Sequence, residues 1–243
     1  MDARRLRELA PESGLAEGME QGPFHHLDVL DHTLETVRGV EREIEASVLG
    51  TRVGPERAED LRLVALLHDI AKPITRGEVD GRVLFVAHDS LGATLAHRIC
   101  RRLGISASLT DLVTTITALH LKIGFMASPH SDYPPERLIR AVGPFGEELT
   151  VLSWADRLAA RGPRLKREHI ERHRELSLEF LGIYQEHGPY EKPDYGRLSR
   201  DLGLSPADTG YAASRLRLLR SRGLDEESGI EYLAGTLRAT STG

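Results

Sequence analysis

Apolar residues recur at three- and four-residue steps along most of this 243-residue chain. That spacing is the signature of amphipathic helices, in which one face is buried. Over residues 24–49 the apolar positions are Leu30, Leu34, Val37, Val40, Ile44 and Val48. Similar spacing predicts helices that begin near residues 54, 88, 108, 147, 164, 211 and 228, and only Val83–Val86 has the pattern of a short strand. The pattern therefore predicts an all-α fold.

The segment from Gly54 to Pro73 is apolar almost all round, which predicts a buried central helix. Gly54 and Pro55 suit its start, and Pro73 suits its end. His68 and Asp69 would then lie in its last turn. Burying such a polar pair without compensation costs several kcal/mol, roughly, so it requires a cation or a strong hydrogen-bond partner.

Three regions differ in composition. Residues 1–23 are charged and broken by proline and glycine, so we expect one short helix, a loose lead-in and no visible chemistry. Residues 24–187 carry the periodic helices and form the main domain. Residues 188–243, with further prolines and glycines, are expected to form a helical C-terminal extension.

Composition narrows the class of protein. Aromatic residues make up 5% and hydrophobic residues 40% of the chain, which fits a helical protein better than a β-sandwich. A net charge of −5 argues against a surface that coats nucleic acid, although 28 of the 32 basic residues are arginine and leave room for local phosphate-binding patches. The single cysteine, the charged start and the absence of a long apolar run indicate a cytoplasmic protein without a membrane span.

An ordered set of histidines and aspartates is the strongest chemical signal in the chain. Its members are His32, His68, Asp69, His88, His120 and Asp156. Imidazole nitrogens with carboxylate oxygens suit first-row divalent ions. Neighbouring helix residues point about 100° apart, so His68 and Asp69 can share one ion. The set predicts one or two divalent ions, with manganese, nickel, cobalt, iron or zinc favoured over magnesium.

The motifs around these residues resemble those of the HD superfamily of metal-dependent phosphohydrolases. His-Asp-Ile-Ala-Lys-Pro at 68–73 is similar to the central motif, His88 to Gly92 to a His-x-x-x-Gly element, and Ala155-Asp156 to the closing Ala-Asp. The resemblance covers residues 24–162 and implies an HD-domain helical bundle. It also implies that His32, His68, Asp69 and Asp156 hold a first ion, and that Asp69 bridges to a second ion completed by His88 and His120.

A narrower resemblance is to the HD domain and C-terminal part of bacterial tRNA nucleotidyltransferases. It rests on residues 24–34, on the glycine-rich turn before His88 and on residues 196–206. The Gly-Ser and paired aspartates that position a nucleotide for transfer are missing, as is a phosphate-binding Gly-x-x-x-x-Gly-Lys loop. Nucleotide addition is therefore not expected.

Further residues are candidates for the catalytic site. Asp69 and Lys72 are assigned as catalytic, and Lys72 and Arg157 as contacts to phosphate oxygens, with plain surface charge as the alternative for these two cations. His25 and Asp28 share a helical face with His32 and are assigned to substrate binding or to orienting a ligand.

Two other groups of residues are interpreted as solvated. His169 and His173 lie four apart on a densely charged segment that lacks the rest of a zinc motif. Arg215, Arg217, Arg220 and Arg222 are split by helical spacing between two faces. We expect both groups to lie on exposed helix surfaces.

The expected function is hydrolysis of a phosphomonoester or a 2′,3′-cyclic phosphate on a nucleotide or an RNA end. One alternative is a noncatalytic RNA-binding or scaffold module derived from the C-terminal part of a tRNA nucleotidyltransferase. Another is hydrolysis of a free signalling nucleotide or a deoxynucleoside triphosphate, because residues outside the motif decide the substrate. The oligomeric state stays open, with the C-terminal helices as the surface through which a homodimer would form.

Overall fold

The computed structural model describes residues 3–126, 128, 130–131, 133–188 and 190–241. The chain is 70% helical, and its described part contains one sheet, of two strands, so the predicted all-α fold is confirmed. The elements up to the hairpin are α1 (Ala3–Leu9), η1 (Pro11–Ala16), α2 (Val29–Ala46), η2 (Pro55–Arg57), α3 (Ala58–Leu67), α4 (Lys72–Thr75), β1 (Arg76–Val79) and β2 (Arg82–Phe85). The elements after it are α5 (His88–Arg102), α6 (Ala107–Leu119), α7 (Lys122–Phe125), α8 (Pro135–Val142), η3 (Gly143–Phe145), α9 (Gly146–Ala159), α10 (Arg167–His187), α11 (Tyr195–Leu202), α12 (Pro206–Ser221) and α13 (Glu226–Ser241).

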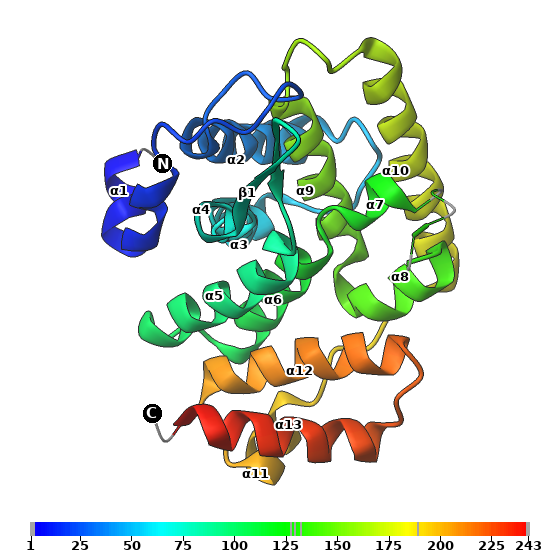
Figure 1. Ribbon diagram of the computed structural model, residues 1–243. Helices are drawn as coiled ribbons and strands as arrows, with labels where there is room; N and C mark the ends of the chain where they lie inside the picture. The colour runs from blue at the N-terminus through cyan, green and yellow to red at the C-terminus, as the bar shows by residue number, and fades with distance from the viewer. Residues whose placement is uncertain (1–2, 127, 129, 132, 189, 242–243) are drawn as a thin grey trace.

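Helix α3 lies at the centre and packs against α2, α6 and α9 (Figure 1). Its Leu61 and Val64 are fully buried, as expected for an apolar helix in the core. Helices α2 and α9 approach each other closely at Gly39. A Cβ atom at this position would lie 3.0 Å from the Cβ of Ala155. Glycine therefore lets α2 lie against α9 next to Asp156.

The segment predicted as one helix from Gly54 to Pro73 is divided. Helix α3 ends at Leu67, a turn follows, and the short α4 begins at Lys72 with Pro73 in its first turn. The placement of Pro73 at a helix end was wrong. Proline is compatible with the first turn of a helix because the backbone N–H groups there have no partner within the helix. Asp69 lies in this turn, so its side chain does not follow the helical spacing of α3.

Helix α2 starts later than the periodicity predicts. Asp28 is its N-cap, and Asp28 Oδ1 accepts a hydrogen bond from the backbone N–H of Asp31. Its other oxygen, Oδ2, accepts one from the backbone N–H of Gly18. A side-chain cap satisfies a backbone donor that has no partner in the helix, so helix formation begins there. His25 therefore lies before the helix.

The predicted strand Val83–Val86 corresponds to β2, but its partner was missed. Strands β1 and β2 form an antiparallel hairpin in which Arg76 pairs with Phe85 and Val79 with Arg82. Asp80 and Gly81 both have positive φ in the two-residue turn, as this kind of hairpin requires. The hairpin leads directly into α5, whose first residue is His88.

The N-terminal segment is more ordered than the predicted loose lead-in. Leu6, Ala10 and Ala16 are buried and belong to the main hydrophobic core. Arg4 and Glu8 of α1 are exposed, so this helix has a charged side as well as a buried one. The segment therefore covers one side of the core (Figure 1).

The sequence analysis predicted no elements where α7, α8 and α11 lie. Of these, α8 has a clear amphipathic pattern, with Leu138, Ile139 and Val142 buried. It is short, and short helices are weak signals because packing contributes most of their stability. Helix α10 was expected to be exposed, but Phe180 and Tyr184 bury one of its faces.

Helices α11 to α13 lie below the main bundle in Figure 1, and α12 packs against α5, α6 and α8. An ion pair joins this region to the bundle. Arg217 Nη1 donates to Asp111 Oδ2 at 2.9 Å and Nη2 to Asp111 Oδ1 at 2.5 Å. Tyr195 donates its hydroxyl to the same carboxylate at 2.9 Å.

Candidate metal centre

His68 and Asp69 lie in the interior at the end of α3. His68 is the C-cap residue, and Asp69 follows it in the turn toward α4. Both side chains are almost completely buried, with exposed fractions of 0% and 2%. Leu66, Leu67 and Ile70 next to them are buried as well, so water does not satisfy the two polar groups.

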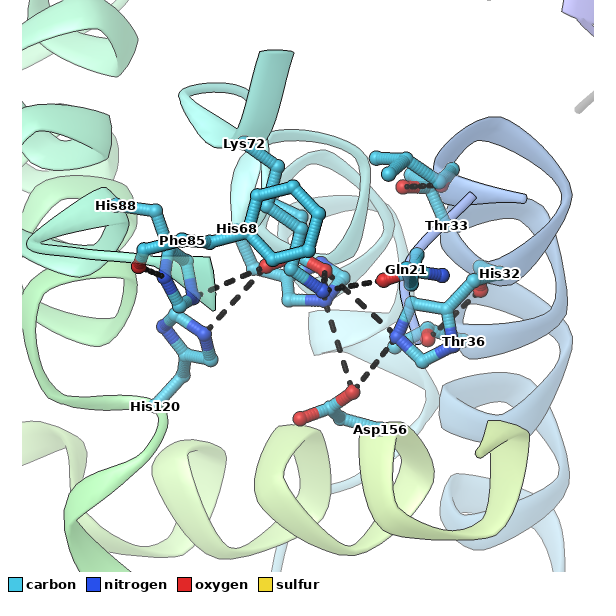
Figure 2. A network of polar contacts seen from close by, with 12 residues as sticks. Gln21, His32, Thr33, Thr36, His68, Lys72, Phe85, His88, His120 and Asp156 are labelled. Carbon is cyan, nitrogen blue, oxygen red and sulfur yellow. Dashed lines mark hydrogen bonds and ion pairs between the residues drawn. The ribbon is translucent and has the colours of Figure 1, made fainter. Parts of the chain in front are cut away.

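Four further residues from separate elements reach the same place. His32 comes from α2, Asp156 from α9, and His88 from the start of α5, while His120 is the C-cap of α6. Their ring nitrogens and carboxylate point inward toward one centre (Figure 2). With His68 and Asp69 they form two groups, in each of which the ligand atoms lie within 4.8 Å of one another: His32, His68 and Asp156, and Asp69, His88 and His120.

Asp69 lies between the two groups and faces both. Its Oδ2 atom is 3.1 Å from His68 Nε2 and 3.7 Å from His32 Nε2. Its Oδ1 atom is 3.5 Å from His88 Nε2 and 3.7 Å from His120 Nε2. One carboxylate therefore offers one oxygen to each group, which is the arrangement needed to bridge two ions.

Backbone carbonyls orient three of the imidazole rings in the same way. The Nδ1 atoms of His68, His88 and His120 each donate to the carbonyl oxygen three residues earlier, at 2.7, 2.7 and 2.8 Å. A neutral imidazole that donates from Nδ1 carries its lone pair on Nε2. The local backbone thus turns each Nε2 atom toward Asp69, as in metal sites where a second contact fixes the orientation of the ligand ring.

The charges of the site also suit a cation. Burial raises the pKa of Asp69, but the charges of His68 and Lys72 outweigh burial and hold that pKa well below its ordinary value. Burial likewise raises the pKa of Asp156, and the hydrogen bond and charge of His32 bring it well below. Burial lowers the pKa of His120 to about 4. At neutral pH the site therefore offers carboxylates and at least one neutral imidazole, the forms that bind metals.

Several ligand atoms are buried without a hydrogen bond. Among the described residues these include His68 Nε2, His88 Nε2 and Asp69 Oδ1. Buried polar atoms nearly always have a partner, so unpaired atoms that converge on one point indicate a missing one. Nitrogen and oxygen donors at this spacing suit a divalent ion bound at roughly 2.0–2.2 Å. The residues present therefore fit one or two divalent metal ions.

Lys72 is buried in the site and is not a surface charge. Its Nζ atom lies 2.6 Å from Asp69 Oδ2 and donates to Gln21 Oε1 at 2.6 Å. The ring of Phe85 lies 5.5 Å from this nitrogen (Figure 2). An ammonium group has three donors, so one N–H remains for another acceptor.

The other three residues predicted to contact the substrate or a ligand are His25, Asp28 and Arg157, and each has a different environment. The His25 ring packs edge-on against His32 with centroids 4.8 Å apart, and burial lowers the pKa of His25 to about 3. Asp28 is used as the cap of α2 and accepts two backbone hydrogen bonds there. Arg157 follows Asp156 on α9, and its guanidinium lies beside Gly124 of α7.

Two polar contacts at the site were not predicted from the sequence. Gln21 comes from the segment in which no chemistry was expected, and no local pattern marks it. Lys122 Nζ pairs with Asp89 Oδ2 at 3.1 Å, close in the chain to the candidate ligands His88 and His120. The sequence held a signal for this pair, because Asp89 directly follows His88, Lys122 follows His120 by two residues, and the two differ in charge.

Two residues assigned to solvated surfaces are buried or paired. His173 is 5% exposed, and its Nε2 atom lies 3.1 Å from both Ser153 Oγ and the Ser153 carbonyl oxygen. Arg217 holds the buried Asp111. His173 and Arg217 lie on helices that carry many polar residues. The pattern of charge alone therefore does not indicate which side of these helices packs inward.

The helical fold and the clustered His and Asp side chains indicate the family to which this chain belongs. A model of the HD domain matches residues 29–161, which is more than half of the chain. The chain therefore belongs to the HD-domain family, within a superfamily of metal-dependent phosphohydrolases.

Particular relatives are about 30% identical to this chain over aligned stretches of 152 to 179 residues. They include the A-adding tRNA nucleotidyltransferase of Deinococcus radiodurans, 33% identical over 63% of this chain and 32% of the relative. The CC-adding tRNA nucleotidyltransferase of Thermus thermophilus is 31% identical over 72% of this chain and 36% of the relative. A bifunctional uridylyltransferase/uridylyl-removing enzyme of Nitrobacter hamburgensis is 32% identical over 57% of this chain and 15% of the relative.

The chain thus spans about a third or less of the length of these curated relatives. Within the described residues, no helix combines the length and the apolar character required to cross a bilayer.

Proposed function

We propose that this protein is a phosphomonoesterase or a 2′,3′-cyclic phosphodiesterase that acts on a nucleotide or on the phosphate at an RNA end. The proposal takes His32, His68, Asp69, His88, His120 and Asp156 as ligands of one or two divalent ions. It assigns the chemistry to the centre between α2, α3, α5, α6 and α9.

The position of Asp69 is the observation that carries this proposal. Its two oxygens face two separate groups of histidines, and it is 2% exposed. A purely structural carboxylate would instead accept hydrogen bonds from both groups with ordinary geometry. The converging unpaired donors support a centre built for a cation pair.

Divalent ions held there would lower the pKa of a bound water and neutralise charge on phosphate oxygens. The protein's own residues would fix the geometry. The backbone contacts of His68, His88 and His120 keep their Nε2 atoms directed inward. During hydrolysis, a bond forms between the water oxygen and phosphorus, the bond to the leaving oxygen breaks, and that oxygen gains a proton.

Lys72 is proposed to hold Asp69 and to contact the substrate. Its contacts with Asp69 and Gln21 fix the ammonium group beside the bridging carboxylate. The remaining N–H would donate to a non-bridging phosphate oxygen, where a charge-assisted hydrogen bond is stronger than a neutral one. His25, packed on His32, would keep that ligand ring in place. Arg157 stays the second proposed phosphate contact.

The names of the relatives support this type of substrate. Two are tRNA nucleotidyltransferases, and the third is named for both transfer and removal of a uridylyl group. Removal of a uridylyl group requires cleavage at a phosphate ester. We therefore favour a nucleotide or an RNA end over an unrelated phosphate compound.

The test combines metal analysis with a substrate panel. The purified protein would be analysed for metals, then assayed with manganese, nickel, cobalt, iron, zinc and magnesium. Substrates would be a nucleoside 3′-phosphate, a 2′,3′-cyclic phosphate, a phosphate-terminated RNA and a deoxynucleoside triphosphate. The variant His68→Ala/Asp69→Ala should lose bound metal and at least about a hundredfold in kcat/KM, because metal catalysis contributes several kcal/mol.

A second buried His–Asp pair offers a matched control. His97 Nε2 lies 2.8 Å from Asp208 Oδ1, outside the metal centre. The variant His97→Ala/Asp208→Ala should keep its metal and its activity if it remains folded by circular dichroism. Full activity in His68→Ala/Asp69→Ala would contradict the proposed centre. Bound metal without hydrolysis of any substrate, together with tight RNA binding, would favour the noncatalytic module.

A further inference from the structure

A small basic cavity lies between α5, α6 and α12. Its volume is about 160 Å³, and its lining includes Ser90, Lys122, Tyr133, Arg215 and Arg222. Sites for whole drug-sized ligands usually measure about 300–1,000 Å³, and a water molecule takes about 30 Å³. The cavity therefore suits a group the size of a phosphate better than a whole nucleoside.

Two residues that line the cavity follow candidate metal ligands closely in the chain. Ser90 follows His88 by two residues, and Lys122 follows His120 by two. Residues two apart have Cα atoms at most about 7 Å apart. Lys122 also pairs with Asp89, the residue directly after His88. Neighbouring residues of α5, and of the turn between α6 and α7, therefore border both the cavity and the candidate metal centre.

The charges in the cavity are unbalanced. Lys122 has Asp89 as a partner at 3.1 Å, and the ring of Tyr133 lies 5.5 Å from its ammonium group. In the part of the chain that the structure describes, the side chains of Arg215 and Arg222 have neither an ion pair nor a hydrogen bond. Three cations thus face one carboxylate. Like charges gathered in a concave site attract an anion.

The arginines of α12 and of its C-cap differ in their partners. Arg215 and Arg222 are seven residues apart, which is close to two helical turns, so they lie on the same face. Arg217 pairs with the buried Asp111, and Arg220 pairs with Glu226 on another side. The two arginines without partners are thus the two that line the cavity.

We propose that this cavity, which we name the Lys122 pocket, binds a second phosphate group of the substrate. Lys122, Arg215 and Arg222 would contact its oxygens while the reactive phosphate lies at the metal centre. The preferred substrate is therefore a nucleotide or RNA end that carries two phosphates. This choice of substrate rests on the proposed function, whereas anion binding in the pocket does not.

The first experiment measures anion binding without catalysis. Full-length protein treated with a chelator would be titrated with inorganic phosphate at low ionic strength, using calorimetry. The variant Arg215→Ala/Arg222→Ala should bind phosphate at least about tenfold more weakly, because hydrogen bonds to charged groups contribute more than neutral ones. Arg220→Ala removes one positive charge from the same helix outside the cavity and should bind as the unmodified protein does.

The second experiment asks whether the anion belongs to the substrate. Metal-loaded protein would be assayed with adenosine 3′-monophosphate and adenosine 3′,5′-bisphosphate. The bisphosphate should have a KM at least about tenfold lower, and Arg215→Ala/Arg222→Ala should lose that advantage while kcat for the monophosphate is unchanged. Arg220→Ala should keep the advantage.

The outcomes separate the two proposals. Equal phosphate binding by the unmodified protein and Arg215→Ala/Arg222→Ala would overturn the pocket, whatever the activity. Phosphate binding in the pocket without a bisphosphate advantage would overturn its assignment to the substrate and leave a site for free anions. Absence of hydrolysis with intact phosphate binding would count against the proposed function alone. Melting curves for each variant would confirm that it is folded.

Discussion

At the scale of single residues, burial decides what each histidine can do. His169 and His173 lie one helical turn apart on α10, yet His169 is exposed and His173 is buried against Ser153 and Trp154. Burial, followed by the charge of Arg157, lowers the pKa of His173 from its ordinary value of 6.5 to about 4. A lowered pKa means that the folded protein keeps this ring neutral where the unfolded chain binds a proton.

The lowered pKa of His173 predicts a loss of stability in mild acid. Between pH 6.5 and about 4 the unfolded chain binds more protons at this residue than the folded protein, so the free energy of unfolding falls as the pH falls. His173→Gln should reduce this dependence by up to about 3 kcal/mol over that interval. Urea unfolding at a series of pH values, with chelator present, measures the effect.

His169→Gln is the matched control, since its side chain is exposed. It should leave the dependence of stability on pH unchanged. Parallel curves for the unmodified protein and His173→Gln would contradict the assignment of this acid sensitivity to His173.

At the scale of elements, a few contacts between helices set the geometry. Gly39 lets α2 approach α9, which brings His32 within 2.8 Å of Asp156. On the other side, Arg217 of α12 holds Asp111 of α6, whose side chain is 0% exposed. These contacts join elements that are distant in the chain, so they link the metal centre to the packing of the whole bundle.

The Asp111–Arg217 pair should be essential to the docking of α12. Arg217→Ala leaves a buried carboxylate without its cation, which typically costs about 3–5 kcal/mol of stability. Urea unfolding measures this cost. Arg220→Ala removes an exposed ion pair and should change the stability by less than about 1 kcal/mol.

A double substitution tests the same idea in the opposite direction. Asp111→Leu with Arg217→Met replaces both charges by apolar groups and should recover most of the loss, because no unpaired charge remains. A double variant as unstable as Arg217→Ala would show that packing, not charge, holds α12.

At the scale of the whole molecule, one hydrophobic core connects regions that the composition separates. Leu6 from the N-terminal segment, Leu112 from α6 and Leu218 from α12 belong to the same core cluster. The division at residues 23 and 187 remains a prediction about domain organisation. The candidate ligands lie on, or at the ends of, five helices of this bundle, so metal binding should act on the stability of the whole chain.

Metal addition should therefore raise the melting temperature. An ion that is present at a hundred times its dissociation constant stabilises the folded state by about 2.7 kcal/mol. For a chain of this size that corresponds to an increase of about 5–10 °C. Thermal unfolding followed by circular dichroism, after chelator treatment and then with manganese, nickel, cobalt, iron or zinc, measures the shift.

Asp69→Asn keeps the shape of the bridging residue and removes its charge, so the metal should stabilise this variant much less. Magnesium should produce a smaller shift than the other ions because it prefers oxygen ligands. An equal shift in Asp69→Asn would show that the ions bind elsewhere.

Local chemistry allowed much of this protein to be predicted from sequence. Helical periodicity indicated the long helices, and the types and order of His and Asp residues indicated a metal site, because both depend on properties that each residue carries with it. The predictions failed where a local pattern had several solutions. Pro73 is compatible with either the end or the start of a helix. Asp28 is compatible either with a place beside the candidate ligands or with the N-cap of a helix.

Only the tertiary structure decided which distant residues meet. It brought Gln21 to Lys72, turned Asp69 between two groups of histidines, and placed Arg217 against Asp111 rather than in solvent. Such contacts depend on how helices pack, and packing is selected by the fit of the whole core rather than by any one segment. The sequence by itself determined the chemistry available to the protein, and the fold determined where that chemistry is concentrated.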